Sequence, residues 1–405
     1  MLCFWGIAVR FDIPSDSKYG GKIIQIIFLL ISIEFGAFCL YKGPIYSPDS
    51  ATYSAWAELL IQNDFNVVVF SSQANFVFSA SFYALWVCLI AVLKLLLGEY
   101  WGHGVIALNL ISALSLIWVS LWFVAQKTRD LYSVAIVAFC FATSIDFLNL
   151  TAYVLSDVTY AAFVAIFLNW LSRCKANPVP LSGWILAVVS LLLLMFYRPV
   201  TLPLFAVLII AAISHPWFMA STPVSRNKLF GLLLVLALLT SALFLSHAYL
   251  MMHVTSPAEA GLWIVQLSRD YNQGMVVYQR LETYRPIPEN YGDYIAISIL
   301  KIMYFWAPWF QGYGNFHRLI NIVNFFLSYV LVSYALILAS KSFIRANLKN
   351  LWEIWVLCLT LCVFTIFHSL QQIDYDVRYR IPLLWPLYTL AGLGFYKIRS
   401  LYRSN

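Results

Sequence analysis

Two carboxylates and several arginines stand beside apolar segments, where their types and spacing could support group-transfer chemistry. The first carboxylate, Asp49, lies in the stretch Gly43–Tyr53, directly after the first long apolar segment. Pro48 fixes one backbone dihedral, and Asp49 or Ser50 is expected to cap the helix that follows. A carboxylate here could remove a proton from an acceptor hydroxyl or amine. It could equally belong to an ordinary capped helix lying on a membrane surface.

A second carboxylate, Asp157, ends the stretch Leu148–Asp157 between two apolar segments. One interpretation makes Asp157 the N-cap of a helix that begins at Val158. The other interpretation places it in the same cavity as Asp49. Two further acids, Glu34 and Asp146, fall within or near apolar segments, where a carboxylate needs a polar partner or a wet cavity.

Three arginines could bind a phosphate, because a planar guanidinium forms paired hydrogen bonds with phosphate oxygens. Arg198 precedes a proline in a tight turn, and Arg378 and Arg380 precede the last apolar segment. Alternatively, the Arg198 side chain could extend its charged end to the membrane surface and have no role in binding. Arg378 and Arg380 could instead pair with Asp374 and Asp376. For these two arginines we favour phosphate binding.

The composition indicates the class of protein that must position these side chains. Apolar residues make up 62% of the chain and charged residues 11%, with 15 Trp, 25 Tyr and 30 Phe. Runs of about 20 apolar residues are long enough to cross a bilayer as helices. We therefore expect an all-α, polytopic integral membrane protein. Charged residues precede the first apolar run, so no cleavable signal peptide is expected.

Metal and cofactor sites are not indicated. The seven Cys are scattered without a close Cys-x-x-Cys pair, and the six His form no i, i+4 pair. The sequence therefore predicts no cofactor, no metal site and no disulfide framework, although a divalent metal is compatible with the expected chemistry. No feature points to nucleic acid as a partner.

Basic residues in short loops favour the cytoplasmic side of a membrane and so predict the topology. They all become cytoplasmic if the segments 74–97 and 295–310 lie along the outer membrane face. About ten crossings then remain, with both termini inside: 23–41, 104–125, 131–148, 158–172, 182–197, 200–213, 229–251, 319–340, 351–370 and 381–396. We expect a single membrane domain over residues 1–405. Its outer parts are a first loop with interfacial helices at 42–103 and a large loop at 252–318.

The order of these parts resembles the GT-C class of membrane glycosyltransferases, of the dolichyl-phosphate-mannose protein mannosyltransferase and lipid A aminoarabinose transferase type. The matching motifs are Ser47-Pro48-Asp49-Ser50 with the helix that follows, Leu155-Ser156-Asp157, Arg198-Pro199, and Arg378-Tyr379-Arg380-Ile381-Pro382 before the last apolar helix. Relatives often carry a second acid beside the first aspartate, and this chain has Ser50 there.

The resemblance implies a transferase that moves a sugar from a polyprenyl-phosphate donor to a lipid, glycan or protein acceptor. It implies a multi-pass protein of a membrane such as the bacterial plasma membrane, with the active site facing outward and membrane lipids around it. Asp49 is then the candidate base, and Asp157 orients the acceptor or the sugar. The candidate phosphate ligands are Arg378, Arg380, Arg198 and, more weakly, Lys42. The residues expected to line the substrate are Glu34, Tyr53 and Glu58.

Two other classes of protein share some of these features. A lipid-glycan polymerase or ligase, such as an O-antigen polymerase, would have a similar size and outer arginines. It would need no acidic base after the first crossing. A transporter or flippase would carry polar residues near the middle of the membrane, often in broken-helix repeats, and the sequence shows little of either.

Overall fold

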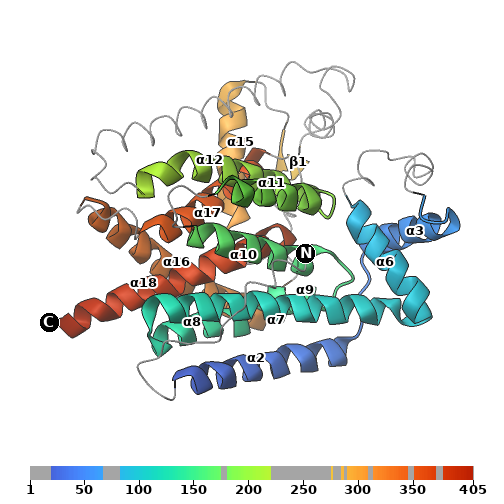
Figure 1. Cartoon of the computed structure of the whole chain (residues 1–405), viewed down its shortest axis with the longest axis horizontal. Helices are drawn as coiled ribbons and strands as arrows, with labels where there is room; N and C mark the ends of the chain where they lie inside the picture. The colour runs from blue at the N-terminus through green and yellow to red at the C-terminus, as the bar shows by residue number, and fades with distance from the viewer. Residues whose placement is uncertain are drawn as a thin grey trace.

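The protein is a helical bundle with a smaller helical part at one end (Figure 1). The computed structural model describes residues 20–66, 83–174, 180–219, 275–276, 284–286, 290–308, 313–344, 351–370 and 377–404. In these ranges the regular structure is helical except for β1 (Met275–Val276) and β2 (Tyr284–Arg285), which pair antiparallel. The expected all-helical class is confirmed.

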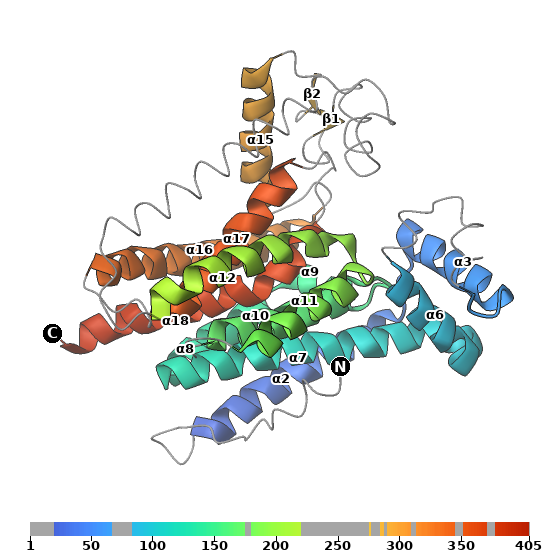
Figure 2. The same cartoon turned by 45° about the horizontal axis from the view of Figure 1, so that its top comes forward.

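The bundle is built from long helices that lie alongside one another in both ribbon views (Figures 1 and 2). They are α2 (Gly20–Lys42), α7 (Trp101–Thr128), α8 (Leu131–Ala142), α9 (Ile145–Thr151), α10 (Asp157–Arg173), α11 (Leu181–Met195), α12 (Leu202–Met219), α16 (Asn315–Ile344), α17 (Trp352–Leu370) and α18 (Leu384–Ser404). In the part of the chain that the structure describes, short 3₁₀ helices precede α7, α12 and α18: η1 (Gly98–Tyr100), η2 (Pro199–Thr201) and η5 (Val377–Leu383).

Several helices have the length and composition of membrane spans. Within the described ranges, four stretches are long and apolar enough to cross a bilayer: Gly20–Lys42, Ala84–Thr128, Asn315–Ile337 and Trp352–Ser369. The helices α8 and α9 pass the same test when taken together, with a bend of 60° between them. They count as a fifth span if the bent pair crosses the bilayer as one segment. These helices support a protein embedded in a membrane. The number of ten crossings stays a prediction, and the expected crossing at 229–251 lies outside the described residues.

Ion pairs join helix ends at one end of the bundle, which we call the basic end. Lys127 at the end of α7 pairs with Glu353 at the start of α17. Arg399 of α18 pairs with Asp130, which caps α8 through a 3.1 Å hydrogen bond from the backbone N–H of Ser133. These contacts fasten the ends of four helices to one another.

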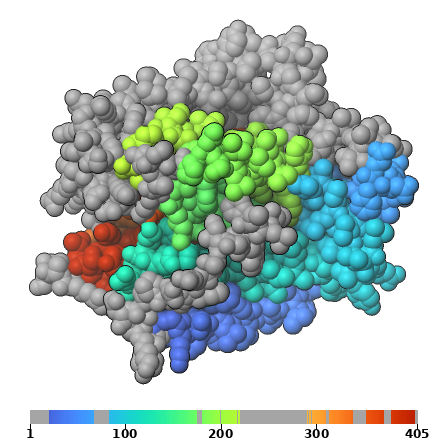
Figure 3. All heavy atoms as spheres, viewed as in Figure 1, coloured from blue at the N-terminus to red at the C-terminus, as the bar shows by residue number. Residues whose placement is uncertain are grey.

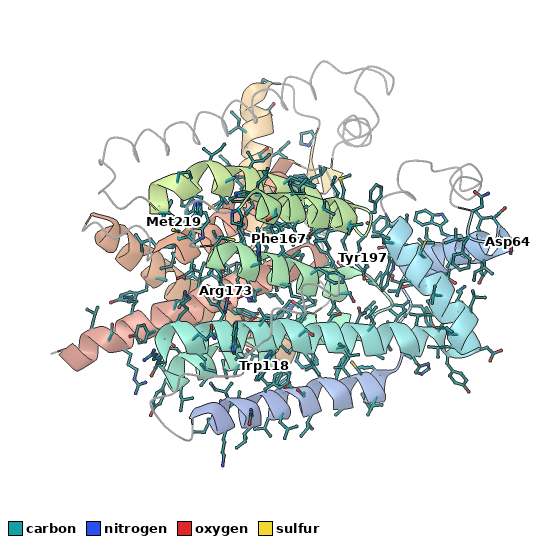
Figure 4. All side chains as sticks on the ribbon, in the orientation of Figure 1. Asp64, Trp118, Phe167, Arg173, Tyr197 and Met219 are labelled. Carbon is teal, nitrogen blue, oxygen red and sulfur yellow. The ribbon has the colours of Figure 1, made fainter. Side chains whose placement is uncertain are left out.

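The opposite end of the bundle, which we call the site end, carries the candidate functional residues. Asp157 and Arg173 are the first and last residues of the 17-residue α10, so they mark the site end and the basic end. Figure 4 likewise shows Tyr197 close to α6 and Met219 at the other side of the bundle. Beyond the site end project α3 (Pro48–Gln62) and α6 (Ala84–Leu97), which pack on each other (Figures 1 and 3).

The helix α6 does not run the length of the bundle. It starts where the backbone N–H of Leu85 donates to the carbonyl of Phe196 at 3.1 Å, and it ends directly before η1 and the start of α7. Both of its ends therefore lie at the site end. The expectation that the segment 74–97 does not cross stays a prediction, and residues 74–82 lie outside the described ranges.

The helix α15 (Tyr291–Phe305) stands at a steep angle to the bundle in both ribbon views and packs on α17 (Figure 2). Of the expected large loop at 252–318, the structure describes β1, β2, α15 and the residues around the start of α16. The division of the chain into a single domain with two outer regions stays a prediction.

The last helix, α18, is the centre of the packing. It contacts α7, α8, α16 and α17, and the ring of Trp385 packs edge-on against Phe123, with centroids 5.5 Å apart. A Cβ atom at Gly394 would overlap the carbonyl oxygen of Leu331 on α16. The close approach of these two backbones therefore requires glycine, as is common where membrane helices pack.

Candidate functional site

The residue that caps α3 is Ser47, and the expectation that Asp49 or Ser50 is the cap was wrong. The side chain of Ser47 accepts from the backbone N–H of Ser50 at 3.3 Å. The hydroxyl of Ser50 accepts from the backbone N–H of Ser47 at 3.0 Å, which completes a capping box. Asp49 therefore stands in the first turn of α3, where the helix dipole favours a negative charge, and its carboxylate has no capping role.

The segment before α3 is bonded to the loop that leads into α10. Ile45 forms an isolated parallel bridge with Tyr153: its N–H donates to the carbonyl of Ala152 and its carbonyl accepts from Val154, both at 2.9 Å. The hydroxyl of Ser50 also donates to the carbonyl of Val154 at 2.9 Å. The Asp49 and Asp157 segments thus form one unit, as the shared-cavity interpretation requires.

Asp49 forms an ion pair with Arg378 of η5. The guanidinium nitrogen Nη1 lies 2.5 Å from the carboxylate oxygen Oδ2. The side chain of Asp49 is 47% exposed and that of Arg378 is 22% exposed. A ligand can therefore reach both groups. The structure brings together the candidate base and one candidate phosphate ligand.

Asp157 forms a second ion pair, with Arg198, and this pair is buried. Nη1 of Arg198 lies 2.6 Å from Oδ1 of Asp157, and the two side chains are 7% and 2% exposed. The contact lacks hydrogen-bond geometry, so its attraction is electrostatic. Arg198 also donates to the hydroxyl of Ser156 at 3.3 Å. Burial alone would lower the pKa of Arg198, but Asp157, Tyr83 and Tyr53 together outweigh it and raise the pKa well above its ordinary value.

The buried pair corrects two expectations. The interpretation of Asp157 as an N-cap was wrong, because α10 begins at Asp157 itself and Ser156 occupies the cap position without a side-chain cap bond. Arg198 does not reach for the membrane surface either, since it is buried against Asp157. With its charge neutralised and covered, Arg198 is a poor ligand for an incoming phosphate.

Tyr53 of α3 interacts electrostatically with members of both ion pairs. It is 7% exposed, and its ring lies 5.1 Å from the ring of Tyr83, centroid to centroid. Burial raises the pKa of the Tyr53 phenol well above its ordinary range, and the pKa also responds to Tyr83, Arg198, Asp157 and Asp49. The Tyr53 phenol thus interacts with both carboxylates, and its expected place in the substrate lining stays a prediction.

Three of the other candidate residues have different surroundings. The Lys42 ammonium lies over the rings of Phe38 and Tyr41 on its own helix, at 6.0 and 5.5 Å from their centroids. Glu34 is on the exposed face of α2. Glu58 is 60% exposed and pairs with Lys94 at 2.5 Å.

Lys94 explains the position of Glu58. Besides that ion pair, its ammonium donates to the side-chain hydroxyl of Ser54 at 2.7 Å and to the backbone carbonyl of Ser54 at 3.2 Å. It also lies 5.1 Å from the ring of Trp101. The contacts of Glu58 and Ser54 with Lys94 therefore join α3 to α6, and the expected place of Glu58 in the substrate lining stays a prediction.

Arg380 does not share the surroundings of Arg378. Its guanidinium donates to the carbonyl of Ala307 at 2.6 Å, and its side chain lines a cavity between η5, α9, α16 and α18. A 3₁₀ helix turns by about 120° per residue, so positions 378 and 380 face different directions. The alternative pairing with Asp374 and Asp376 lies outside the described residues.

Asp146 and Asn321, which line the cavity, belong to a cluster that was not predicted from the sequence. Asp146 accepts three hydrogen bonds: from the hydroxyl of Tyr313 at 2.6 Å, from Nε2 of His317 at 2.9 Å and from Nδ2 of Asn321 at 2.9 Å. The rings of Tyr313 and His317 are stacked, with centroids 3.8 Å apart. We call these four residues the Asp146 clamp.

No family model, curated protein or solved structure matches this chain. Within the described ranges, no group of three or more His, Cys, Asp or Glu side chains is placed to hold a metal ion.

Proposed function

We propose that this protein is a membrane glycosyltransferase that transfers a sugar from a polyprenyl-phosphate donor to an acceptor at the outer side of the membrane. The observation that carries the proposal is the Arg378–Asp49 ion pair, with its 2.5 Å contact. It joins a cation suited to phosphate with a carboxylate suited to proton removal, and both are accessible. The resemblance of the motif order to GT-C transferases supports the same reaction.

The ion pair suggests how donor binding prepares the base. A phosphate offers the guanidinium of Arg378 more negative charge and more oxygen atoms than one carboxylate does. The donor phosphate therefore displaces Asp49 from Arg378. The released carboxylate is then free to accept a proton from the acceptor.

The proposed reaction balances without a further reagent. The acceptor hydroxyl or amine gives its proton to a carboxylate oxygen of Asp49. The freed electron pair forms a bond to the anomeric carbon of the sugar. The bond between this carbon and the phosphate oxygen breaks, and its electrons leave with the polyprenyl phosphate. Arg378 stabilises the charge on the departing phosphate.

The outward orientation of the site rests on the charges of the bundle ends. The basic end carries Lys127, Arg129, Arg173 and Arg399, and positive charge beside membrane helices favours the cytoplasm. The site end then faces outward, with both termini inside, and α3, α6 and α15 lie near the outer face. This orientation brings Asp49 to the side on which polyprenyl-linked sugars are consumed in the GT-C resemblance.

A transfer assay with purified protein tests the proposal. The protein in lipid nanodiscs is incubated with radiolabelled polyprenyl-phosphate sugars and with a membrane fraction as acceptor. Label that moves from the donor to acceptor material, and no longer does so with the Asp49→Asn variant, supports the proposal. Transfer that is unchanged in Asp49→Asn would instead favour a polymerase or ligase that uses no acidic base.

A further inference from the structure

The cavity beside Arg380 has the dimensions of a small-molecule site. Its volume is about 70 Å³, and its walls come from α9, α16, η5, α18 and the segment Trp306–Pro308. A buried water needs about 10–15 Å³ measured in this way, so the cavity has room for roughly five waters. That is enough for one sugar ring or a similar small molecule and too little for an oligosaccharide.

The Asp146 clamp gives the cavity a fixed hydrogen-bond acceptor. Both carboxylate oxygens of Asp146 are oriented by donors from Tyr313, His317 and Asn321. An ionised carboxylate has about four acceptor positions, so three bonds leave about one for a ligand. A hydroxyl group that enters the cavity can therefore donate to Asp146 without disturbing the clamp.

The rest of the lining combines polar groups with rings. Ser144, Asn324 and Ser328 supply hydroxyl and amide groups, and Trp306 and Tyr329 supply aromatic surface. A small number of well-placed polar groups in a lining with aromatic rings is typical of a small-molecule site. A sugar presents both features, because its hydroxyls donate and accept while its C–H faces pack on rings.

The charges of the lining favour a neutral ligand. Among the described residues that line the cavity, Arg380 is the one cation and Asp146 the one carboxylate. A free phosphate would meet the carboxylate, and a protonated amino sugar would meet the guanidinium. A neutral sugar can donate to Asp146 and accept from Arg380 at the same time.

We propose that this cavity binds a neutral monosaccharide ring, and that, given the proposed function, this ring is the sugar of the donor. Arg378 and Arg380 are two residues apart on η5. In this arrangement the phosphate of the donor binds Arg378, and its sugar extends around η5 to Arg380. Arg378 thus binds the phosphate of the donor, and Arg380 binds its sugar.

Binding of free monosaccharides tests this site without the lipid donor. Methyl glycosides of neutral hexoses are titrated into purified protein in nanodiscs, and binding is followed by saturation-transfer NMR. Ser328→Leu fills the cavity and leaves the Asp146 clamp in place. Asp146→Asn removes the charge but keeps an acceptor oxygen. We expect each variant to bind at least one hexoside about tenfold more weakly than the wild type.

A matched control comes from the same helix. Ser333 is exposed on α16, so Ser333→Leu adds the same side chain without filling the cavity, and it should bind the hexoside like the wild type. Arg378→Ala should also retain hexoside binding, because Arg378 does not line the cavity. Equal loss in Ser328→Leu and Ser333→Leu would mean that the hexoside binds elsewhere, and the proposal would fall.

Two further results would overturn the site, and a third concerns only the proposed function. The site is wrong if wild-type protein binds no neutral hexoside up to saturating millimolar concentrations. It is also wrong if inorganic phosphate competes with the hexoside in wild type and this competition is lost in Arg380→Gln. Hexoside binding together with a complete lack of transfer from any polyprenyl-phosphate sugar would count against the transferase alone.

Discussion

The guanidinium of Arg378 lies 2.5 Å from the carboxylate of Asp49, a residue 329 positions away in the chain. The loop before α3 and the 3₁₀ helix before α18 therefore meet at the site end. The two side chains form an ion pair in which each charge is paired with the other. In the proposed reaction, the donor phosphate replaces Asp49 on Arg378, so proton removal is limited to molecules that carry a donor.

Replacement of Asp49 by asparagine should abolish sugar transfer and leave the protein folded. The amide cannot accept the acceptor's proton, and loss of a positioned base typically costs about 10²–10⁴-fold in rate. Because Ser47 caps α3, the substitution removes no capping bond. The measurement is the turnover number of purified Asp49→Asn with saturating donor, beside its thermal unfolding midpoint.

Glu58→Gln is the matched control for this prediction. Glu58 lies on the same helix, is more exposed than Asp49 and pairs with Lys94. An exposed ion pair of this kind contributes about 0–1 kcal/mol, so Glu58→Gln should retain most of the activity. Similar losses in both variants would mean that any change of charge on α3 impairs transfer, and Asp49 would lose its assignment.

Substitutions of the two arginines of η5 should have different effects on the affinity for lipid ligands. Arg378→Ala should weaken binding of bare polyprenyl phosphate by about 10–100-fold, the range for a lost hydrogen bond to a charged group of about 1.5–3 kcal/mol. Arg378→Lys should recover part of this loss, since an ammonium provides the charge without the paired geometry. Arg380→Ala should leave the affinity for bare polyprenyl phosphate unchanged and weaken only the sugar-bearing donor.

Affinities can be measured for both lipids by calorimetry or by thermal shift in nanodiscs. If Arg378→Ala binds bare polyprenyl phosphate like the wild type, the ion pair with Asp49 serves the fold and not the donor. If Arg380→Ala weakens both lipids equally, the two arginines share the phosphate, as the sequence analysis expected.

Composition and helical runs were sufficient to predict the class of fold, because a bilayer leaves few solutions for so apolar a chain. The pairing of charges could not be predicted in the same way. From the sequence, Asp157 and Arg198 were assigned to separate contacts with substrate. In the structure both side chains are buried and pair with each other, because an unpaired buried charge is costly. The sequence names the charged residues but not which arginine meets which carboxylate, since that depends on how the helices pack.

Two features were readable in the sequence and were passed over. Ser47 and Ser50 have the spacing of a capping box, with serine in place of the usual Glu or Gln. In the expected crossing 319–340 and just before it, polar side chains recur at helical spacing: His317, Asn321, Asn324 and Ser328. Such a stripe within an apolar helix indicates a polar site, and Asn321, Asn324 and Ser328 line the cavity around Asp146.

Cysteine labelling can test the proposed orientation of the bundle. In a variant without the seven native cysteines, Glu99→Cys places a thiol at the site end and Tyr132→Cys places one at the basic end. Both positions are exposed, with Tyr132 at 59%. An impermeant maleimide added to intact cells should label the Cys at 99 and not the Cys at 132. Labelling of the Cys at 132 alone would show the opposite orientation, with the site on the cytoplasmic side.

The buried Asp157–Arg198 pair should act on stability more than on the chemical step. Removing one member, as in Arg198→Met, leaves a carboxylate that is 2% exposed without its partner, which typically costs about 3–5 kcal/mol. The double variant Arg198→Met with Asp157→Asn removes both charges and should recover much of this loss. The measurement is the thermal unfolding midpoint of each variant in detergent, with transfer activity normalised to folded protein. If the single variant Arg198→Met is as stable as the wild type but has lost activity, the result would instead support a role for Arg198 in binding phosphate.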